Sequence, residues 1–301
     1  QCGVSGVTAS DGGSITLIGA KTTVHHNCTR GGRDANGLQV IGSPSSTIQL
    51  LPPLTKETVS TDNGGGGNWG ATEKGRVKQI KDITATTLAV AKKALATGTV
   101  RVPDDCKTLV EAMDAVGAVG AVETMPNQHS RISIVLGEGE HQIDQIDGDC
   151  LKVCSAVRIV GVSNVPKEKV VVLGGIWFTS GIQGNCHLQH MTLCPERHAT
   201  GVGVSGDSSF TMEDVLVEHF GLYGVYASGT GVVGRCTNVE VRQCADSGVG
   251  ALNGASIILI GAKTTVHHNC TNGNSWEYGL QVSDSSSSTI QLVSPLTKEQ
   301  V

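Results

Sequence analysis

Residues 209–244 read SFTMEDVLVEHFGLYGVYASGTGVVGRCTNVEVRQC, and this stretch decides the fold class. Apolar and polar residues alternate through 210–220 and again through 235–244, and a period of two residues is that of a β-strand. Steps of Gly followed by Val or Leu recur after 23, 24 and 31 residues: Gly201-Val202, Gly224-Val225, Gly248-Val249 and Gly279-Leu280. Short strands between such regularly placed turns predict a parallel β-helix.

A Greek-key β-sandwich is the alternative fold, although a sandwich does not require the same turn signature in every coil. Upstream, the apolar residues between Leu109 and Val116 follow a helical period, and Asp104 and Asp105 precede them. This pattern predicts a short helix that covers the open end of the solenoid core. Further strands are predicted around a Gly turn in 131–143 and over 157–162 and 170–173.

The arrangement resembles the right-handed parallel β-helix of the pectate-lyase-like superfamily. The features that carry the resemblance are the short helix, the strand IVLGEGEHQI at 134–143 and the coils with Gly-Val turns. More narrowly, residues 209–244 resemble β-helix repeat proteins of unicellular algae that have no assigned activity. The resemblance covers residues 104–301 and 1–54, implies an all-β solenoid with a capping helix, and transfers no catalytic residue.

An internal repeat sets the organisation of the chain. Residues 14–57 and 256–299 align without a gap at an offset of 242, with 32 of 44 positions identical. Because both ends of the chain fall inside the repeated block, a tandem array is favoured over a single partial duplication. We expect 1–59 to be the C-terminal part of a preceding β-helix repeat, 60–103 a Gly-rich connector and entry segment, and 104–301 a β-helix domain.

Composition excludes several classes of protein. Glycine makes up 40 of 301 residues without the strict period of collagen, and charged residues are too few for a disordered chain. No apolar run is long enough to span a membrane as a helix, so we expect no membrane span. A net charge of −5 without a basic cluster gives no footprint for nucleic acid. We also expect no cofactor.

Ten cysteines are many for a cytosolic protein of this length. Neighbouring coils lie about 4.8 Å apart, a separation that a disulfide accepts, so Cys244–Cys270 and its repeat Cys2–Cys28 are candidate bridges. An inward ladder of free thiols is an equally good interpretation. A zinc site at Cys186, His187, His190 and Cys194 is disfavoured because residues of a strand that are three apart face opposite sides, and we expect no metal.

Two repeated Asn-Cys-Thr motifs are candidate glycosylation sites, at Asn27 and Asn269. The alternative is that these asparagines stack in the turns of a β-helix. Together with the number of cysteines, the motifs favour an extracellular or cell-surface protein.

The sequence contains only weak candidates for a catalytic site. Glu218, Arg242 and His267 could stack in a column on the outer face, but one arginine without paired carboxylates is weak support for a lyase. The densest carboxylate run is Asp144, Asp147 and Asp149, which lacks the spacing of a calcium loop. We therefore predict a non-catalytic structural repeat that associates end to end with identical units. The alternatives are a polysaccharide lyase, a hydrolase or a carbohydrate-binding module, with glycans as partners.

Overall fold

The chain forms two compact units, residues 1–89 with 118–124 and residues 90–117 with 125–301, which are described separately. The computed structural model describes residues 2–10, 14–17, 21–30, 32, 35–41, 46–50, 54–71, 76–79, 85–122, 132–143, 150–196, 201–283, 287–299 and 301. The carboxylate run between residues 144 and 149 lies outside the described residues.

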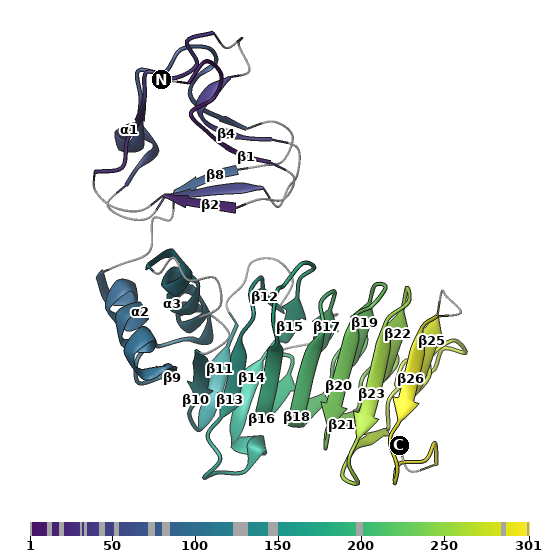
Figure 1. Cartoon of the computed structure of the whole chain (residues 1–301). Helices are drawn as coiled ribbons and strands as arrows, with labels where there is room; N and C mark the ends of the chain where they lie inside the picture. The colour runs from purple at the N-terminus through teal and green to yellow at the C-terminus, as the bar shows by residue number, and fades with distance from the viewer. Residues whose placement is uncertain are drawn as a thin grey trace. The chain divides into compact units, whose positions relative to one another are not determined.

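The first unit is a short stack of coils (Figure 1). Its elements are β1 (Val7–Ala9), β2 (Ser14–Leu17), β3 (Val24–His25), β4 (Asn36–Val40), β5 (Thr47–Leu50), α1 (Lys56–Val59), β6 (Ser60–Thr61), β7 (Gly67–Ala71) and β8 (Arg76–Gln79). Parallel pairing joins them in the orders β1-β4-β7, β2-β5-β8 and β3-β6. Each coil therefore lays its strands beside the same strands of the coil before it.

The second unit begins with helices and continues as a longer stack. Its early elements are α2 (Ala85–Thr97, of which 85–89 fall in the first unit), β9 (Thr99–Val102), α3 (Leu109–Val122, of which 118–122 fall in the first unit), β10 (Ser133–Leu136), β11 (Gly139–Gln142), β12 (Cys150–Val153), β13 (Arg158–Gly161), the 3-10 helix η2 (Lys167–Lys169), β14 (Val170–Leu173) and β15 (Gly175–Phe178). The later elements are β16 (Cys186–Cys194), β17 (Val204–Gly206), β18 (Phe210–Glu218), β19 (Val225–Ser228), β20 (Val233–Thr237), β21 (Glu240–Arg242), β22 (Val249–Leu252), β23 (Ser256–Ile260), β24 (Thr265–His267), β25 (Leu280–Ser283) and β26 (Thr289–Leu292).

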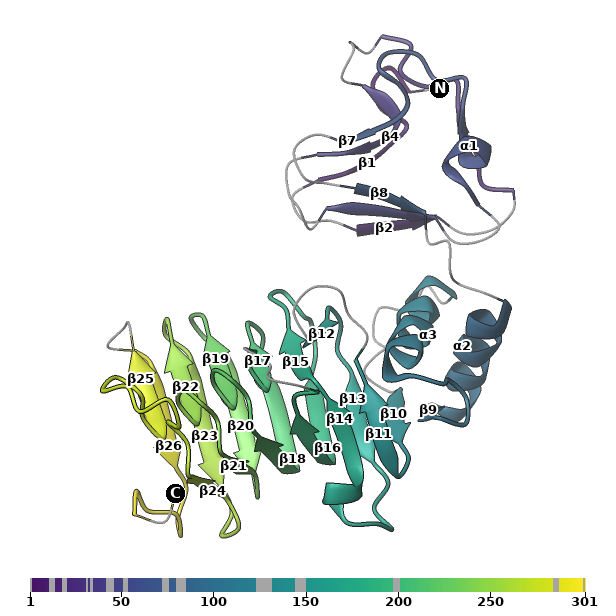
Figure 2. The ribbon, with the colours of Figure 1, turned by 180° about the vertical axis from the view of Figure 1, so that it is seen from behind.

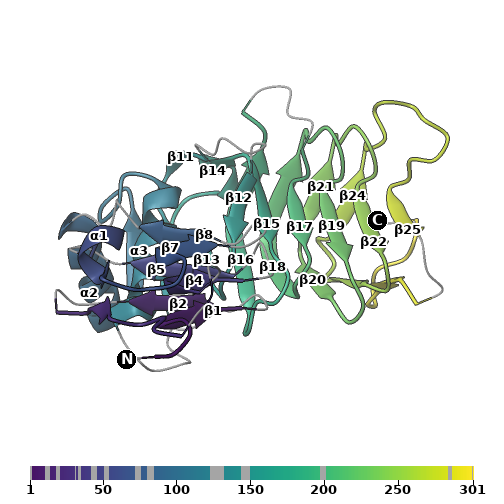
Figure 3. The ribbon, with the colours of Figure 1, turned by 90° about the horizontal axis from the view of Figure 1, so that it is seen from above.

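These strands form a parallel solenoid with a six-stranded and a twelve-stranded sheet. Figure 3 shows the six-stranded sheet as β12, β15, β17, β19, β22 and β25 side by side. The described strand pairs are all parallel, which excludes the Greek-key sandwich. The predicted parallel β-helix is confirmed.

The core is a set of apolar ladders that run from coil to coil. Ile159, Leu188 and Met212 are aligned on successive strands and are fully buried, or nearly so. The rings of Phe178 and Phe210 stack with their centroids 5.7 Å apart. Inward side chains alternate with outward ones along each strand, which is why the sequence shows a period of two.

Helices lie at the β9 end of the second solenoid (Figure 2). Ala91 and Ala94 of α2 and Leu109, Ala112 and Val116 of α3 are fully buried. Their apolar faces supply the cover that an open solenoid end needs. The helix predicted from the 109–116 pattern is confirmed, as are the strands predicted in 131–143, 157–162 and 170–173.

Long strands bend at residues with left-handed backbone. His190 inside β16 has a φ of 55°, Asp214 inside β18 has 51°, and Asn238 between β20 and β21 has 52°. These three residues hold equivalent places in successive coils, because Gln189, Glu213 and Thr237 directly before them are in register. Asn and Asp adopt this conformation at lower cost than most residues, so the corner suits them.

Two details differ from the sequence prediction. The glycine aligned with Gly224 is Gly203 and not Gly201, because Val204 pairs with Val225. The Gly-rich stretch predicted to be a connecting loop contains β7, and β6, β7 and β8 continue the first solenoid. Within 60–103, the described residues include β6, β7, β8, α2 and β9.

Candidate functional site

A charged cluster occupies the outer face of β18 and β21. Arg242 donates from Nε to Oε2 of Glu218 at 2.8 Å and from Nη1 to Oε1 of Glu240 at 2.9 Å. The bond to Glu218, followed by the charges of both carboxylates, outweighs partial burial and raises the pKa of Arg242 above its ordinary value. Arg242 is thereby a permanent cation clamped between two carboxylates.

His267 joins this cluster from β24. Its Nε2 lies 3.3 Å from Oε1 of Glu240, and its Nδ1 lies 2.6 Å from Nδ1 of His268. The three weak catalytic candidates Glu218, Arg242 and His267 are thus brought into one network, through Glu240. The cluster has the geometry of an ion-pair column between coils, and its cation is already neutralised by the protein's own carboxylates.

A second cluster forms at the strand corners. His190 donates from Nε2 to the carbonyl oxygen of Val165 at 2.7 Å and from Nδ1 to Oδ2 of Asp214 at 2.6 Å. Lys167 donates to the other oxygen of Asp214 at 3.1 Å. Because both partners of the imidazole accept hydrogen bonds, His190 carries both ring protons in this arrangement.

The pKa shifts of His190 and Asp214 agree with a doubly protonated imidazole. Burial alone would lower the pKa of His190, but the Val165 carbonyl and the Asp214 carboxylate together raise it above its ordinary value. Burial likewise opposes ionisation of Asp214, yet hydrogen bonds from His190 and Lys167 lower the pKa of its carboxyl group overall. Both shifts favour the charged forms, an imidazolium paired with a carboxylate.

A cavity of about 690 Å³ lies beside this pair. Polar groups of Ser163, Asn164, Gln189 and Glu213 line it, together with His190 and Asp214. The sequence prediction considered His190 only as a zinc ligand. The signal it missed is that His190 and Asp214 are 24 residues apart, which is the step from Gly224 to Gly248.

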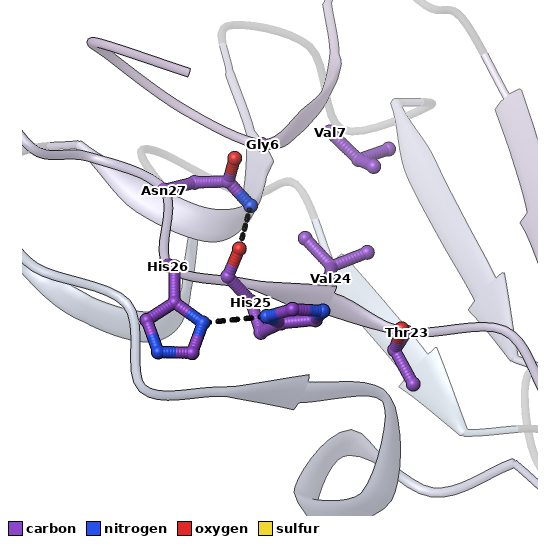
Figure 4. A pocket seen from close by; sticks show the side chains of 7 residues that line it. All are labelled: Gly6, Val7, Thr23, Val24, His25, His26 and Asn27. Carbon is purple, nitrogen blue, oxygen red and sulfur yellow. Dashed lines mark hydrogen bonds between the residues drawn. The ribbon is translucent and has the colours of Figure 1, made fainter. Parts of the chain in front are cut away.

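The first unit has its own cavity of about 480 Å³, shown in Figure 4. His25 and His26 lie on its wall with their Nδ1 atoms in contact, and the amide of Asn27 donates to the His25 carbonyl oxygen. Val266, which is the copy of Val24 in the second unit, pairs with Val241 of the preceding coil.

All ten cysteines are free thiols. The candidate pairs nevertheless interact: burial, followed by the charges of Glu218 and then Cys270, raises the pKa of Cys244 to about 11. In the repeat, burial and then Cys2 raise the pKa of Cys28. Cys28 and Cys244 are buried, Cys270 is partly buried and Cys2 is exposed, so the four thiols do not all face inward. The two candidate bridges stay a prediction.

The two glycosylation candidates are engaged in the turns. Oδ1 of Asn27 accepts from the amide of Cys2 at 2.9 Å, and Oδ1 of Asn269 accepts from the amide of Cys244 at 3.0 Å. The Nδ2 atoms donate to main-chain carbonyl oxygens at 3.0 and 3.1 Å. A glycan on either Nδ2 would compete with these bonds, so the geometry favours a ladder role for both asparagines.

The residues considered for a zinc site make separate contacts. His187 contacts Thr211 through Nδ1 at 2.7 Å, whereas His190 pairs with Asp214. Cys186 is buried in the core, and burial raises its pKa to about 11. Among the residues that the structure describes, no group of three or more His, Cys, Asp or Glu residues could hold a metal ion.

Comparison with known proteins supports the fold. Residues 175–292, which span β15 to β26, match the family model described as the right handed beta helix region. No curated protein and no solved structure matches the chain. The parallel coils and this match define a right-handed β-helix protein. In the described parts of the chain, no helix has the length and apolar character needed to cross a membrane.

Proposed function

We propose that the chain is a structural repeat unit of an extracellular rod, filament or surface layer, in which β-helix units associate end to end. One observation carries the proposal: the duplicated block builds the same coil twice. Thr29 and Thr271 donate to the carbonyl oxygens of Cys2 and Cys244 at 3.4 Å in both copies. His26 and its copy His268 have φ angles of 53° and 54°. A sequence that reproduces one coil so closely suits a stacked array.

The charged column supports a structural role over catalysis. The guanidinium of Arg242 already donates to Glu218 and Glu240, so it is not available to bind an acidic sugar. Pairs of this kind tie neighbouring coils together in register. The extracellular setting rests on the number of cysteines in the sequence.

Negative-stain electron microscopy and sedimentation velocity test the proposal. The purified chain should form linear assemblies as its concentration rises, and the axial repeat of these assemblies should be constant. Monodisperse single particles at every concentration would contradict the structural proposal.

Carbohydrate binding is the second candidate function, because the 690 Å³ cavity combines amide, hydroxyl and carboxylate groups. Saccharides would occupy it through hydrogen bonds to Gln189, Asn164 and Glu213. A panel of acidic and neutral polysaccharides, with binding and product release both measured, separates a binding module from a lyase or hydrolase. Binding that Gln189→Ala abolishes would support this second function.

A further inference from the structure

One wall of the 690 Å³ cavity is a strap, residues 162–169, which connects β13 to β14 and contains η2. Val162, Ser163 and Asn164 of this strap line the cavity. The residues of the strap are exposed or only partly buried. Apolar packing therefore does little to hold the strap in place.

Hydrogen bonds to the neighbouring coils hold the strap instead. Nε2 of His190 donates to the carbonyl oxygen of Val165 at 2.7 Å, and Oγ1 of Thr192 donates to that of Lys167 at 3.1 Å. Nζ of Lys167 donates to Oδ1 of Asp214 at 3.1 Å. Of these bonds, the one to Val165 is adjacent in sequence to the residues that line the cavity, and it depends on a proton that a histidine can lose.

The His190 ring makes both of its hydrogen bonds only while it carries two protons. Nδ1 lies 2.6 Å from Oδ2 of Asp214, and Nε2 faces the Val165 carbonyl oxygen. When one proton leaves, one ring nitrogen turns a lone pair toward an acceptor oxygen. Since the bond to the carboxylate is the stronger of the two, Nδ1 keeps its proton and Nε2 loses its own. Repulsion between Nε2 and the carbonyl oxygen then replaces the tether to Val165.

The charged groups that act on His190 come from β18 and from the strap itself. Burial lowers the pKa of His190, but the hydrogen bonds of Val165 and Asp214 and the charge of Asp214 outweigh both burial and the charge of Lys167, so the pKa is raised. The titratable or charged residues on the elements packed against β16 are Glu213, Asp214 and Glu218 of β18, Lys167, Glu168 and Lys169 of η2, and Arg158 of β13, whereas β14 and β15 have none.

We propose that residues 162–169 form a proton-controlled strap, which is held against the cavity while His190 carries two protons and is released when Nε2 loses its proton. A rise in pH therefore loosens one wall of the cavity, and acidification fixes it. The inference concerns the wall of the cavity and not its occupant. It goes beyond both candidate functions, and its test is separate from theirs.

Hydrogen exchange with mass spectrometry on the native chain tests the strap directly. The amides of Val162 and Lys169 donate to the carbonyl oxygens of Leu136 and Pro166, so their exchange reports opening. Rates are recorded from pH 5 to 9 and divided by the rate of an unstructured peptide at the same pH. Protection of the strap should fall about fivefold or more as His190 loses its proton, which is the effect of one lost hydrogen bond. Protection that stays constant over this range would overturn the inference.

Nitrogen-15 NMR of the His190 ring identifies the proton that leaves. Nε2 should lose its proton, and the midpoint of this step should coincide with that of strap opening. Loss from Nδ1 instead would leave the bond to Val165 in place and would refute the proposed release.

Two asparagine variants locate the switch. His190→Asn suits the corner, because Asn238 holds the equivalent corner with a φ of 52°. Its strap should show the low protection of the released state at every pH. His187→Asn is the matched control, because His187 lies on the same strand but contacts Thr211 and not the strap. This control should keep the native pH dependence, and a pH dependence that survives in His190→Asn would contradict the proposal.

Asp214→Asn separates a proton switch from a merely structural role of His190. The imidazolium loses its charged partner in this variant, so the midpoint of strap opening should move to lower pH. Circular dichroism at pH 5 checks that the variant keeps the native fold. A midpoint equal to that of the native chain would overturn the inference.

Discussion

The fit of Phe210 between two glycines makes a quantitative prediction. A Cβ added to Gly234 would lie 2.7 Å from Cζ of Phe210, whereas ordinary contacts begin near 3.4 Å. On the other side, a Cβ on Gly206 would lie 2.5 Å from the same ring. The ring is 2 % exposed and therefore has little room to retreat. Gly234→Ala should cost about 1–3 kcal/mol of unfolding free energy through overpacking.

Replacing the ring should relieve this strain. Phe210→Leu alone should cost about 1–2 kcal/mol because it removes buried ring atoms. In the double variant with Gly234→Ala, the added methyl group occupies space that the ring has left. The combined loss should therefore be smaller than the sum of the single losses by about 1 kcal/mol or more.

Urea unfolding followed by circular dichroism gives the free energies, and hydrogen exchange with mass spectrometry locates the change to β18 and β20. Gly201→Ala is the matched control, because its Cβ meets nothing within 4 Å, and it should stay within about 0.5 kcal/mol of the native chain. Additive losses in the double variant would refute the packing argument.

Three further predictions concern the charged groups and thiols. Asp214→Asn should lower the free energy of unfolding by about 1 kcal/mol at pH 6. The difference from the native chain should shrink as pH rises through the raised pKa of His190, because that ring then loses its charge. Urea titrations from pH 5 to 9 measure this difference. A pH-independent difference would contradict the ion pair. Arg242→Met should cost about 1 kcal/mol or less, with a smaller effect at 1 M salt, as unfolding at two ionic strengths would show. Iodoacetamide at pH 8 should label exposed Cys154 well before Cys236, whose pKa burial raises to about 12; equal rates by mass spectrometry would contradict that burial.

The parallel coils could be predicted because their cause is local. Alternation within 210–220 reports which side chains face the narrow core, and the duplicated block reports that one coil occurs twice. The register was harder to assign at Gly201-Val202-Gly203-Val204, where two identical steps stand side by side. Pairing of Val204 with Val225 resolves it, and that pairing is a contact between coils.

The cluster of His190 and Asp214 was less predictable, because it too depends on a contact between coils. His190 and Asp214 meet because each stands at a left-handed corner, and the alternating pattern of the strands does not show where the corner falls. Glu218 and Arg242 were found because both lie on regular strands, where outward positions can be counted. Sequence periodicity therefore locates residues on strands and fails where the backbone leaves the strand conformation.

The duplicated block separates what sequence determines from what a neighbour determines. Hydrogen bonds within the coil and to the coil before it agree between the copies. The amide of Cys2 donates to Asn27, and the amide of Cys244 donates in the same way to Asn269. Burial disagrees, because Val40 has a following coil and Val282 does not. Since apolar burial is the main stabilising term, a coil of this solenoid draws much of its stability from the coil after it.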